Sequence, residues 1–137
     1  MSANLANDGL SSDCITRGVR VTVQPTYLEE ESNPARGLWA HAYFVRIRNE
    51  GQDRVQLVSR HWIITNAHGV EEHVQGPGVV GKQPILDPGD EFTYTSGCPM
   101  DTPVGTMHGT YRMVSSTGES FDVVIAPFTL AEPLALN

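Results

Sequence analysis

Hydrophobic and polar residues alternate along much of the chain, and a period of two residues is typical of half-buried strands. No segment of about ten residues keeps a helical period without a glycine or proline interrupting it. The sequence therefore predicts an all-β chain. The positions that this pattern turns inward are Val19, Val21, Val23, Tyr43, Val45, Ile47, Tyr111, Met113, Phe121, Val123 and Ile125.

Turn signals separate these short apolar runs. In the segment 86–91, LDPGDE, Pro88 presets φ and Gly89 tolerates positive φ, and Thr117 with Gly118 joins the last predicted hairpin. Turns at such intervals favour an antiparallel two-sheet β-sandwich of immunoglobulin or fibronectin type III character over a barrel. We expect seven to eight strands.

The inward face changes parity within one predicted strand. Val55 and Leu57 share one face, whereas Trp62 and Ile64 fall on the other parity. An extra residue in one strand restores the inward direction, so we predict a β-bulge near Arg60.

The domain organisation follows from length and local composition. A chain of 137 residues has room for one domain. Residues 1–17 are rich in Ser, Asn, Asp and Gly, which predicts a flexible N-terminal leader. The sandwich is expected over residues 18–130, followed by a tail over 131–137.

Charge and hydropathy exclude several classes of partner. Sixteen acidic and nine basic side chains give a formal net charge of −7, which disfavours nucleic acid. No apolar run approaches the roughly 20 residues that cross a bilayer, and the N-terminus lacks a secretory pattern. We therefore expect a cytoplasmic protein without a membrane partner. Two cysteines are too few for a disulfide framework.

The stretch VQGPGVVGKQP, residues 74–84, carries a G-x-G-x-x-G pattern at Gly76, Gly78 and Gly81, followed by Lys82. A dinucleotide site would need a helix after the glycines, and Pro84 with the two valines predicts extended chain instead. The favoured interpretation is a bent connection between strands that needs positive φ. The alternative is an anion nest of backbone amides assisted by Lys82, which would bind a phosphate or nucleotide weakly.

The histidines raise the question of a metal. His61, His68 and His73 lie close together in sequence beside Glu71 and Glu72, but a structural site needs three or four converging ligands. Whether these histidines converge depends on the register of the hairpin. Scattered surface histidines are the favoured interpretation, so we expect neither a metal nor another cofactor.

No catalytic residue is predicted. The chain has no G-x-S-x-G or S-x-x-K sequence, and Cys98 precedes a proline with no base beside it in sequence. The aromatic residues are expected in the core. Trp62 is the exception to test, because a tryptophan partly exposed beside the glycine stretch would be a binding anchor.

Three segments in order resemble the bacterial ApaG family: RHWIITNAHG (60–69), VQGPGVVGKQPILDPGDEFTYTSG (74–97) and TPVGTMHGTYRM (102–113). The resemblance spans about residues 18–130. One departure is Asn66, where the family usually carries Asp. The resemblance implies a fibronectin type III-like sandwich, found alone in bacteria and as a protein-contact module in larger eukaryotic proteins, among them F-box substrate adaptors and a polymerase-associated partner.

The same resemblance implies an association with cobalt and magnesium resistance and with dinucleoside tetraphosphate hydrolysis, without assigning a reaction to the domain. We therefore expect a non-enzymatic module that binds a protein partner through loops and an exposed strand edge. The alternative is a small-molecule sensor of phosphate-containing ligands, with Gly76, Gly78, Gly81 and Lys82 as its contact loop.

Overall fold

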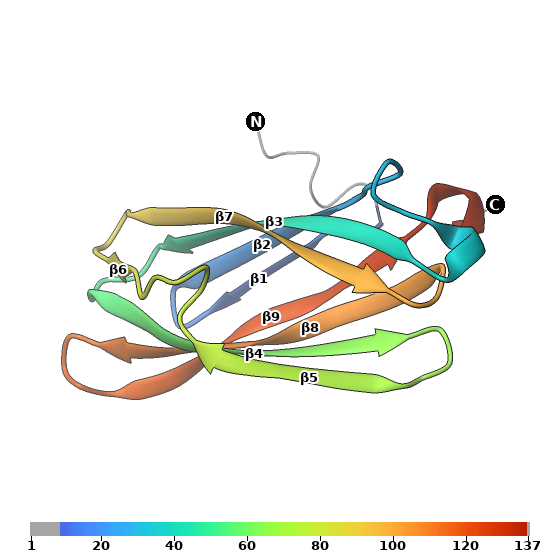
Figure 1. Cartoon of the computed structure of the whole chain (residues 1–137). Coiled ribbons are helices and arrows are strands. Elements are labelled where there is room, and N and C mark those ends of the chain that lie inside the picture. Colours follow the sequence, from blue (N-terminus) through green and yellow to red (C-terminus); the bar gives the residue numbers. More distant parts are fainter. Residues whose placement is uncertain (1–8, 137) are drawn as a thin grey trace.

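The computed structural model describes residues 9–136, which form two packed antiparallel sheets (Figure 1). The first sheet has the strand order β1-β2-β3-β7, and the second has the order β5-β4-β8-β9 with β6 beside β4. The strands in the described part of the chain are β1 Ser12–Thr16, β2 Val19–Tyr27, β3 Trp39–Asn49, β4 Val55–Asn66, β5 Glu71–Pro77, β6 Ile85–Leu86, β7 Glu91–Met100, β8 Val104–Ser115 and β9 Ser120–Ala131. The 3-10 turns η2 Pro34–Arg36 and η3 Pro133–Leu136 flank β3 and β9. The predicted sandwich is confirmed, but the described residues form nine strands where seven to eight were expected.

The expectation of a flexible leader over residues 1–17 is wrong for the segment that forms β1. Strand β1 pairs with β2 along its whole length, and Thr129 N donates to Leu10 O at 2.9 Å on the side of β9. An edge strand gains its hydrogen bonds from the sheet it joins, so it needs no apolar face of its own. Residues 1–8 lie outside the described residues. At the other end β9 runs one residue past the expected boundary, and η3 occupies part of the expected tail.

The core lies between the sheets and is built from the residues that alternation turns inward. Every inward position named from the sequence is buried except Phe121, which is half-buried. Trp62 is packed among aromatic rings, 5.4 Å from Tyr43 and 5.8 Å from Phe128 between centroids. The hydroxyls of Tyr94 and Tyr111 lie 2.5 Å apart and satisfy each other inside the core.

The predicted β-bulge in β4 is confirmed. The register of β4 against β8 shifts between Leu57 and Ser59, two residues before the expected position at Arg60. The extra residue returns Trp62 to the inward face, which is why it can be as buried as Leu57. The turn at 87–90 also forms as predicted, with Gly89 at φ 92° and Asp90 N donating to Asp87 O.

One side of the sandwich is sealed and the other is open. Strand β1 contacts β9 across the two sheets, and Val124 N donates to Thr16 Oγ1 at 3.1 Å. The opposite edge strands are β7 in the first sheet and β5 in the second, so these two flank the open side (Figure 1). Among residues 9–136, no helix has the length and apolar character needed to span a membrane.

Candidate functional site

A groove opens between β7 of the first sheet and β4 and β5 of the second. A pocket of about 250 Å³ lies in its middle part, with Trp62, Met107 and Cys98 at its buried base. Val74 and Ile64, both half-buried, form the wall from the second sheet, and β7 supplies the opposite wall from Ser96 to Pro99. Large apolar side chains therefore meet solvent on this side of the sandwich.

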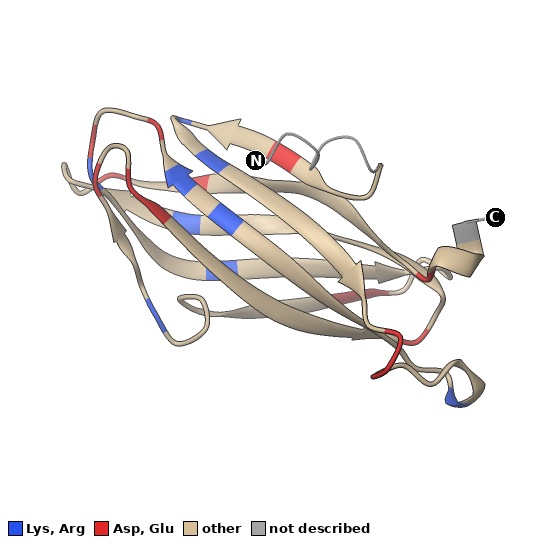
Figure 2. Cartoon of the chain, turned by 90° about the horizontal axis from the view of Figure 1, so that it is seen from above, with Lys and Arg blue, Asp and Glu red and all other residues tan. Residues whose placement is uncertain are grey.

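The groove leads to the end of the molecule that carries most of the net negative charge, here called the acidic end. It is the end where β2 joins β3, β4 joins β5, β7 joins β8 and β9 stops. Arg36 is the one lysine or arginine at this end within the described residues, and positive residues lie mainly toward the other end (Figure 2). The carboxylates at the acidic end are those of Glu29, Glu30, Glu31, Glu71, Glu72, Asp101 and Glu132.

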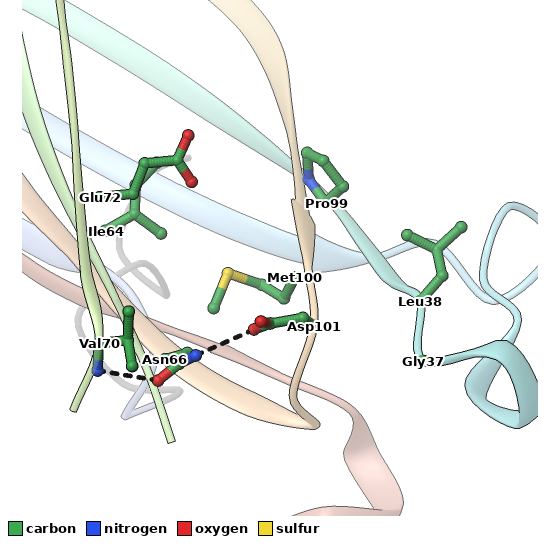
Figure 3. A pocket seen from close by; sticks show the side chains of 9 residues that line it. All are labelled: Gly37, Leu38, Ile64, Asn66, Val70, Glu72, Pro99, Met100 and Asp101. Carbon is green, nitrogen blue, oxygen red and sulfur yellow. Dashed lines mark hydrogen bonds between the residues drawn. The ribbon is translucent and has the colours of Figure 1, made fainter. Parts of the chain in front are cut away.

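A second pocket, of about 330 Å³, lies where the groove reaches the acidic end (Figure 3). It shares Ile64, Glu72 and Pro99 with the first pocket, so the two are continuous. Glu72 comes from β5 and Asp101 directly follows β7, which places one carboxylate on each wall. The apolar lining consists of Leu38, Ile64, Val70, Pro99 and Met100. We call this the end pocket.

Asn66 holds the floor of the end pocket in place. Its Nδ2 donates to Asp101 Oδ1 at 3.1 Å, and its Oδ1 accepts from the backbone N–H groups of His68 at 2.9 Å and Val70 at 3.0 Å. An Asn side chain that folds back on the next turn in this way is a common turn device. The side chain therefore joins the turn between β4 and β5 to the loop after β7.

The outer edge of β7 presents unpaired peptide groups. Asn49 N donates to Asp90 O, and in an antiparallel ladder alternate residues bond to the same neighbour. The peptide N–H and C=O groups of Phe92, and of every second residue after it, therefore point toward β3. The peptide groups that face outward are those of Glu91, Thr93, Thr95, Gly97 and Pro99, and Pro99 has no N–H to donate.

The outer edge of β5 is shorter than that of β7. Gly78 N donates to Val58 O, which places Glu71, His73, Gln75 and Pro77 on the outward side. Charged side chains and proline on an edge strand oppose pairing with another chain. β7 also has a glutamate and a proline in outward positions, Glu91 and Pro99, but Thr93, Thr95 and Gly97 lie between them. β7 therefore offers the longer uncharged run for an added strand.

Burial raises the pKa values of Cys98 in the groove and of tyrosines in the core beneath it. Desolvation raises the pKa of the Cys98 thiol to about 11, and the negative charge of Glu72 adds to the rise. The pKa values of Tyr94 and Tyr111 are raised, also chiefly by desolvation. Cys98 is therefore a neutral thiol at physiological pH, and it is not an activated nucleophile.

The glycine stretch forms a bent connection, as the favoured interpretation predicts, but the extended chain expected at Val79 and Val80 is wrong, because these residues enter a tight turn. Gly76 lies in β5, and a tight turn follows in which Val80 at φ 43° and Gly81 at φ 80° both have positive φ. Val79 and Lys82 exchange two backbone hydrogen bonds of 2.8 Å across this turn. These bonds, with that of Gly78 to β4, occupy three of the amides that an anion nest would need.

Arg60 fastens the glycine stretch to β4. Its Nη1 donates to the carbonyl oxygens of Pro77 at 2.9 Å and Gly78 at 3.0 Å. The guanidinium lies against Gly76, where an added Cβ would be 3.1 Å from Nη1. The missing side chain at Gly76 thus makes room for this cation at the rim of the groove.

Trp62 is not an exposed anchor beside the glycine stretch, so that hypothesis is wrong. Its side chain is 3% exposed, because the bulge turns it into the aromatic core. It reaches the groove only as part of its base.

Two of the three histidines converge. His61 Nε2 and His73 Nδ1 lie 2.9 Å apart on the outer face of the second sheet, and His73 Nε2 is 3.3 Å from Glu71 Oε1. His68 lies in the turn between β4 and β5. Within residues 9–136, no three or more His, Cys, Asp or Glu side chains are grouped so that they could hold a metal ion.

Sequence reasoning missed the two carboxylates of the end pocket and the free edge of β7. Glu72 was considered only as a neighbour of His73, and Asp101 was not singled out. Their proximity depends on how the two sheets stack, which local alternation does not encode. The signal that the sequence did contain was the concentration of acidic residues in the loops of one end.

Two stacked antiparallel sheets, with β1 against β9 on one side and a groove on the other, define a β-sandwich domain. A family model described as the ApaG domain matches residues 29–115. Protein ApaG of Methylobacterium sp. (strain 4-46) is 54% identical over 118 residues, covering 86% of this chain and 91% of that protein. Protein ApaG of Anaeromyxobacter dehalogenans (strain 2CP-C) is 52% identical over 126 residues, covering 92% and 99%.

Solved structures agree with the sequence comparison. The crystal structure of an ApaA protein from Bordetella pertussis has a TM-score of 0.82 at 50% identity, covering 84% of this chain and 94% of that one. The chain therefore belongs to the ApaG family, and the resemblance read from its three motifs is confirmed.

Proposed function

We propose that this chain is a non-enzymatic protein-interaction module that binds an extended segment of a partner along the free edge of β7. The observation that carries the proposal is that edge itself. Thr93, Thr95 and Gly97 direct their peptide groups away from β3, beside an apolar groove. Strand addition to such an edge supplies backbone hydrogen bonds, and pockets for alternate side chains supply specificity.

The groove supports the same role. A strand added to β7 would continue the first sheet over Ile64 and Val74, which are half-buried in the free protein. Covering such side chains contributes about 25 cal/mol for each Å² of apolar surface removed from water. On the opposite side of the described sandwich, β1 and β9 contact each other, so these two edges are partly covered.

A binding role agrees better with the groove chemistry than catalysis does. The raised pKa of Cys98 argues against a thiolate nucleophile in the groove, and the occupied amides of the glycine stretch weaken the phosphate-sensor alternative. We therefore place the partner surface at the β7 edge and the adjoining groove, with Gly76, Gly78, Gly81 and Lys82 as structural support for it.

The test is a selection of binders from a library of random decapeptides, followed by affinity measurements on edge variants. Thr95→Pro removes an outward N–H without removing a bond to β3, whereas Thr95→Val keeps the N–H and serves as the matched control. We expect Thr95→Pro to weaken the selected peptides at least about tenfold, and Thr95→Val to leave their affinity unchanged.

A third variant locates the edge. His73→Pro makes the same backbone change on the outward side of β5. Peptides that lose affinity with His73→Pro and not with Thr95→Pro would bind along β5, and this result would contradict the proposed β7 site. A library that yields no binders would contradict the proposal as a whole.

A further inference from the structure

The two carboxylates of the end pocket lack the cations that neutralise carboxylates elsewhere in the protein. Arg112 is 2.7 Å from Asp122, Arg54 is 2.6 Å from Asp87, and no lysine or arginine among the described residues forms an ion pair with Glu72 or Asp101. The nearest cation in sequence to the end pocket is Arg36 in η2, which is not among its lining residues. The pocket therefore carries uncompensated negative charge.

The surroundings strengthen this charge. The end pocket lies within the acidic end, so carboxylates in the neighbouring loops add to its potential (Figure 2). Charge of one sign gathered around a cleft attracts ligands of the opposite sign and raises their association rate. An anionic or neutral partner group would gain nothing from this field.

One of the two carboxylates is oriented in advance. The amide of Asn66 fixes one oxygen of Asp101, and the N–H of Val70 holds Asn66 (Figure 3). The N–H of His68 donates to the same oxygen of Asn66. A carboxylate whose rotamer is already restricted loses less conformational entropy when a cation binds.

The walls of the end pocket are apolar and selective for shape. Ile64, Val70 and Met100 line the space between the two carboxylates (Figure 3). A bare metal ion would leave these walls uncovered, and no three or more potential ligand side chains are grouped to hold one within the described residues. Lysine and arginine side chains combine an aliphatic stem with a charged head, which suits a pocket of this composition.

We propose that the end pocket binds the side chain of an arginine or lysine carried by the partner segment, with its stem on Ile64, Val70 and Met100 and its charged head at Glu72 and Asp101. This inference rests on the proposed function, because the groove that holds the segment leads into the end pocket. It adds the chemistry of the partner: a basic residue must lie where the segment passes the acidic end.

The experiment uses n-butylguanidinium as the probe and n-butylurea, its neutral counterpart, as the control ligand. Methyl NMR spectra report directly, since Leu38, Ile64, Val70 and Met100 carry methyl groups on the pocket walls. We expect saturable shifts of these methyl signals with the guanidinium probe and none with the urea.

Charge variants separate the pocket from the general field. The double variant Glu72→Gln with Asp101→Asn keeps the acceptor for Asn66. It should lower the affinity for n-butylguanidinium about tenfold or more. Glu29→Gln with Glu30→Gln removes the same number of charges from a loop of the acidic end outside the pocket, and should have a much smaller effect. Binding measured with both pairs therefore distinguishes contact from long-range attraction.

Several results would overturn the proposal. They are equal shifts with n-butylurea, equal weakening by the two pairs of variants, displacement of the probe by an equal concentration of Mg²⁺, or no saturable shift at all. The fragment does not need the β7 edge, so its result is independent of Thr95→Pro. Decapeptides that bind the edge equally well with arginine, citrulline or norleucine would retain the proposed function and overturn the basic-residue pocket.

Discussion

The amide nitrogen of Asn66 donates a 3.1 Å hydrogen bond to the carboxylate of Asp101, and this bond joins the end of β4 in the second sheet to the loop after β7, an edge strand of the first sheet. Because a carboxylate is acceptor-only, Asp101 needs a donor at position 66. The side-chain oxygen of Asn66 accepts from His68 and Val70, so Oδ1 and Nδ2 have separate duties.

The first prediction concerns this pair. Asn66→Asp keeps the acceptor for the turn but replaces the donor with a second charge beside Asp101, and should lower the free energy of unfolding by about 1 kcal/mol. Urea denaturation measures the change. Adding Asp101→Asn should restore most of the loss, because the amide then lies on the other partner. If the double variant is as unstable as the sum of the single variants, the bond does not couple the loops.

The second prediction concerns Gly78 and Gly81, which both have positive φ. A Cβ at Gly78 would overlap the carbonyl oxygen of Lys82, whereas the space around Gly81 is open. Gly81→Ala should cost about 1 kcal/mol of unfolding free energy from backbone strain alone. Gly78→Ala should cost at least about twice as much, since overlap with backbone adds to strain. Equal midpoints in urea for the two variants would show that the turn relaxes freely.

The third prediction concerns Arg60, which bonds the carbonyls of Pro77 and Gly78. Arg60→Met removes both bonds and should loosen the connection after β5. Hydrogen exchange at the Gly78 amide, which donates to Val58, should become roughly tenfold faster. Arg112→Met is the matched control, because Arg112 pairs only with Asp122 on the outer face in the described structure. Similar exchange in both variants would assign Arg60 no role in the connection.

The fourth prediction concerns His41, which is 1% exposed and has no hydrogen-bond partner for either ring nitrogen. Its ring contacts Tyr27 edge-on, and burial lowers the pKa of His41 below its ordinary value of 6.5. Below pH 6.5 His41 is therefore protonated in the unfolded chain while it stays neutral in the folded protein. The free energy of unfolding should fall as pH falls through 6.5, by at most about 1.4 kcal/mol per pH unit.

His41→Phe tests the assignment, since phenylalanine cannot be protonated and leaves no polar atom unpaired. The variant should be at least as stable as the parent at pH 7.5, and the gap should widen between pH 6.5 and pH 5. Asp87 and Glu119 do not contribute to the change between pH 6.5 and pH 5. Arg54 and Arg17 lower the pKa values of these carboxyls from ordinary values of 3.8 and 4.5. A gap that stays constant with pH would exclude His41 as the cause.

The fold was predictable because alternation is a local property. The spacing of Val19, Val21 and Val23 predicts a half-buried strand. The change of inward parity between Leu57 and Trp62 predicts the bulge. The sequence pattern did not predict strand β1, because this edge strand is stabilised by pairing with β2 and has few apolar residues of its own.

The site was predictable only in part. The geometry of the glycine stretch followed from backbone rules, but the closeness of Glu72 and Asp101 depends on the stacking of two sheets. The full burial of Trp62 depends on its packing against Tyr43 and Phe128, which lie on other strands. Outward and inward peptide groups on β7 also depend on pairing register, which no single strand contains.

The contact between β1 and β9 limits how copies of this domain could join. Copies of a sandwich with exposed edge strands on both sides could pair edge to edge without limit. A sandwich with one covered side could pair with a second copy only through its other side. Removing Ser12–Thr16 would expose the edges of β2 and β9, and unpaired edges of this kind favour pairing between copies.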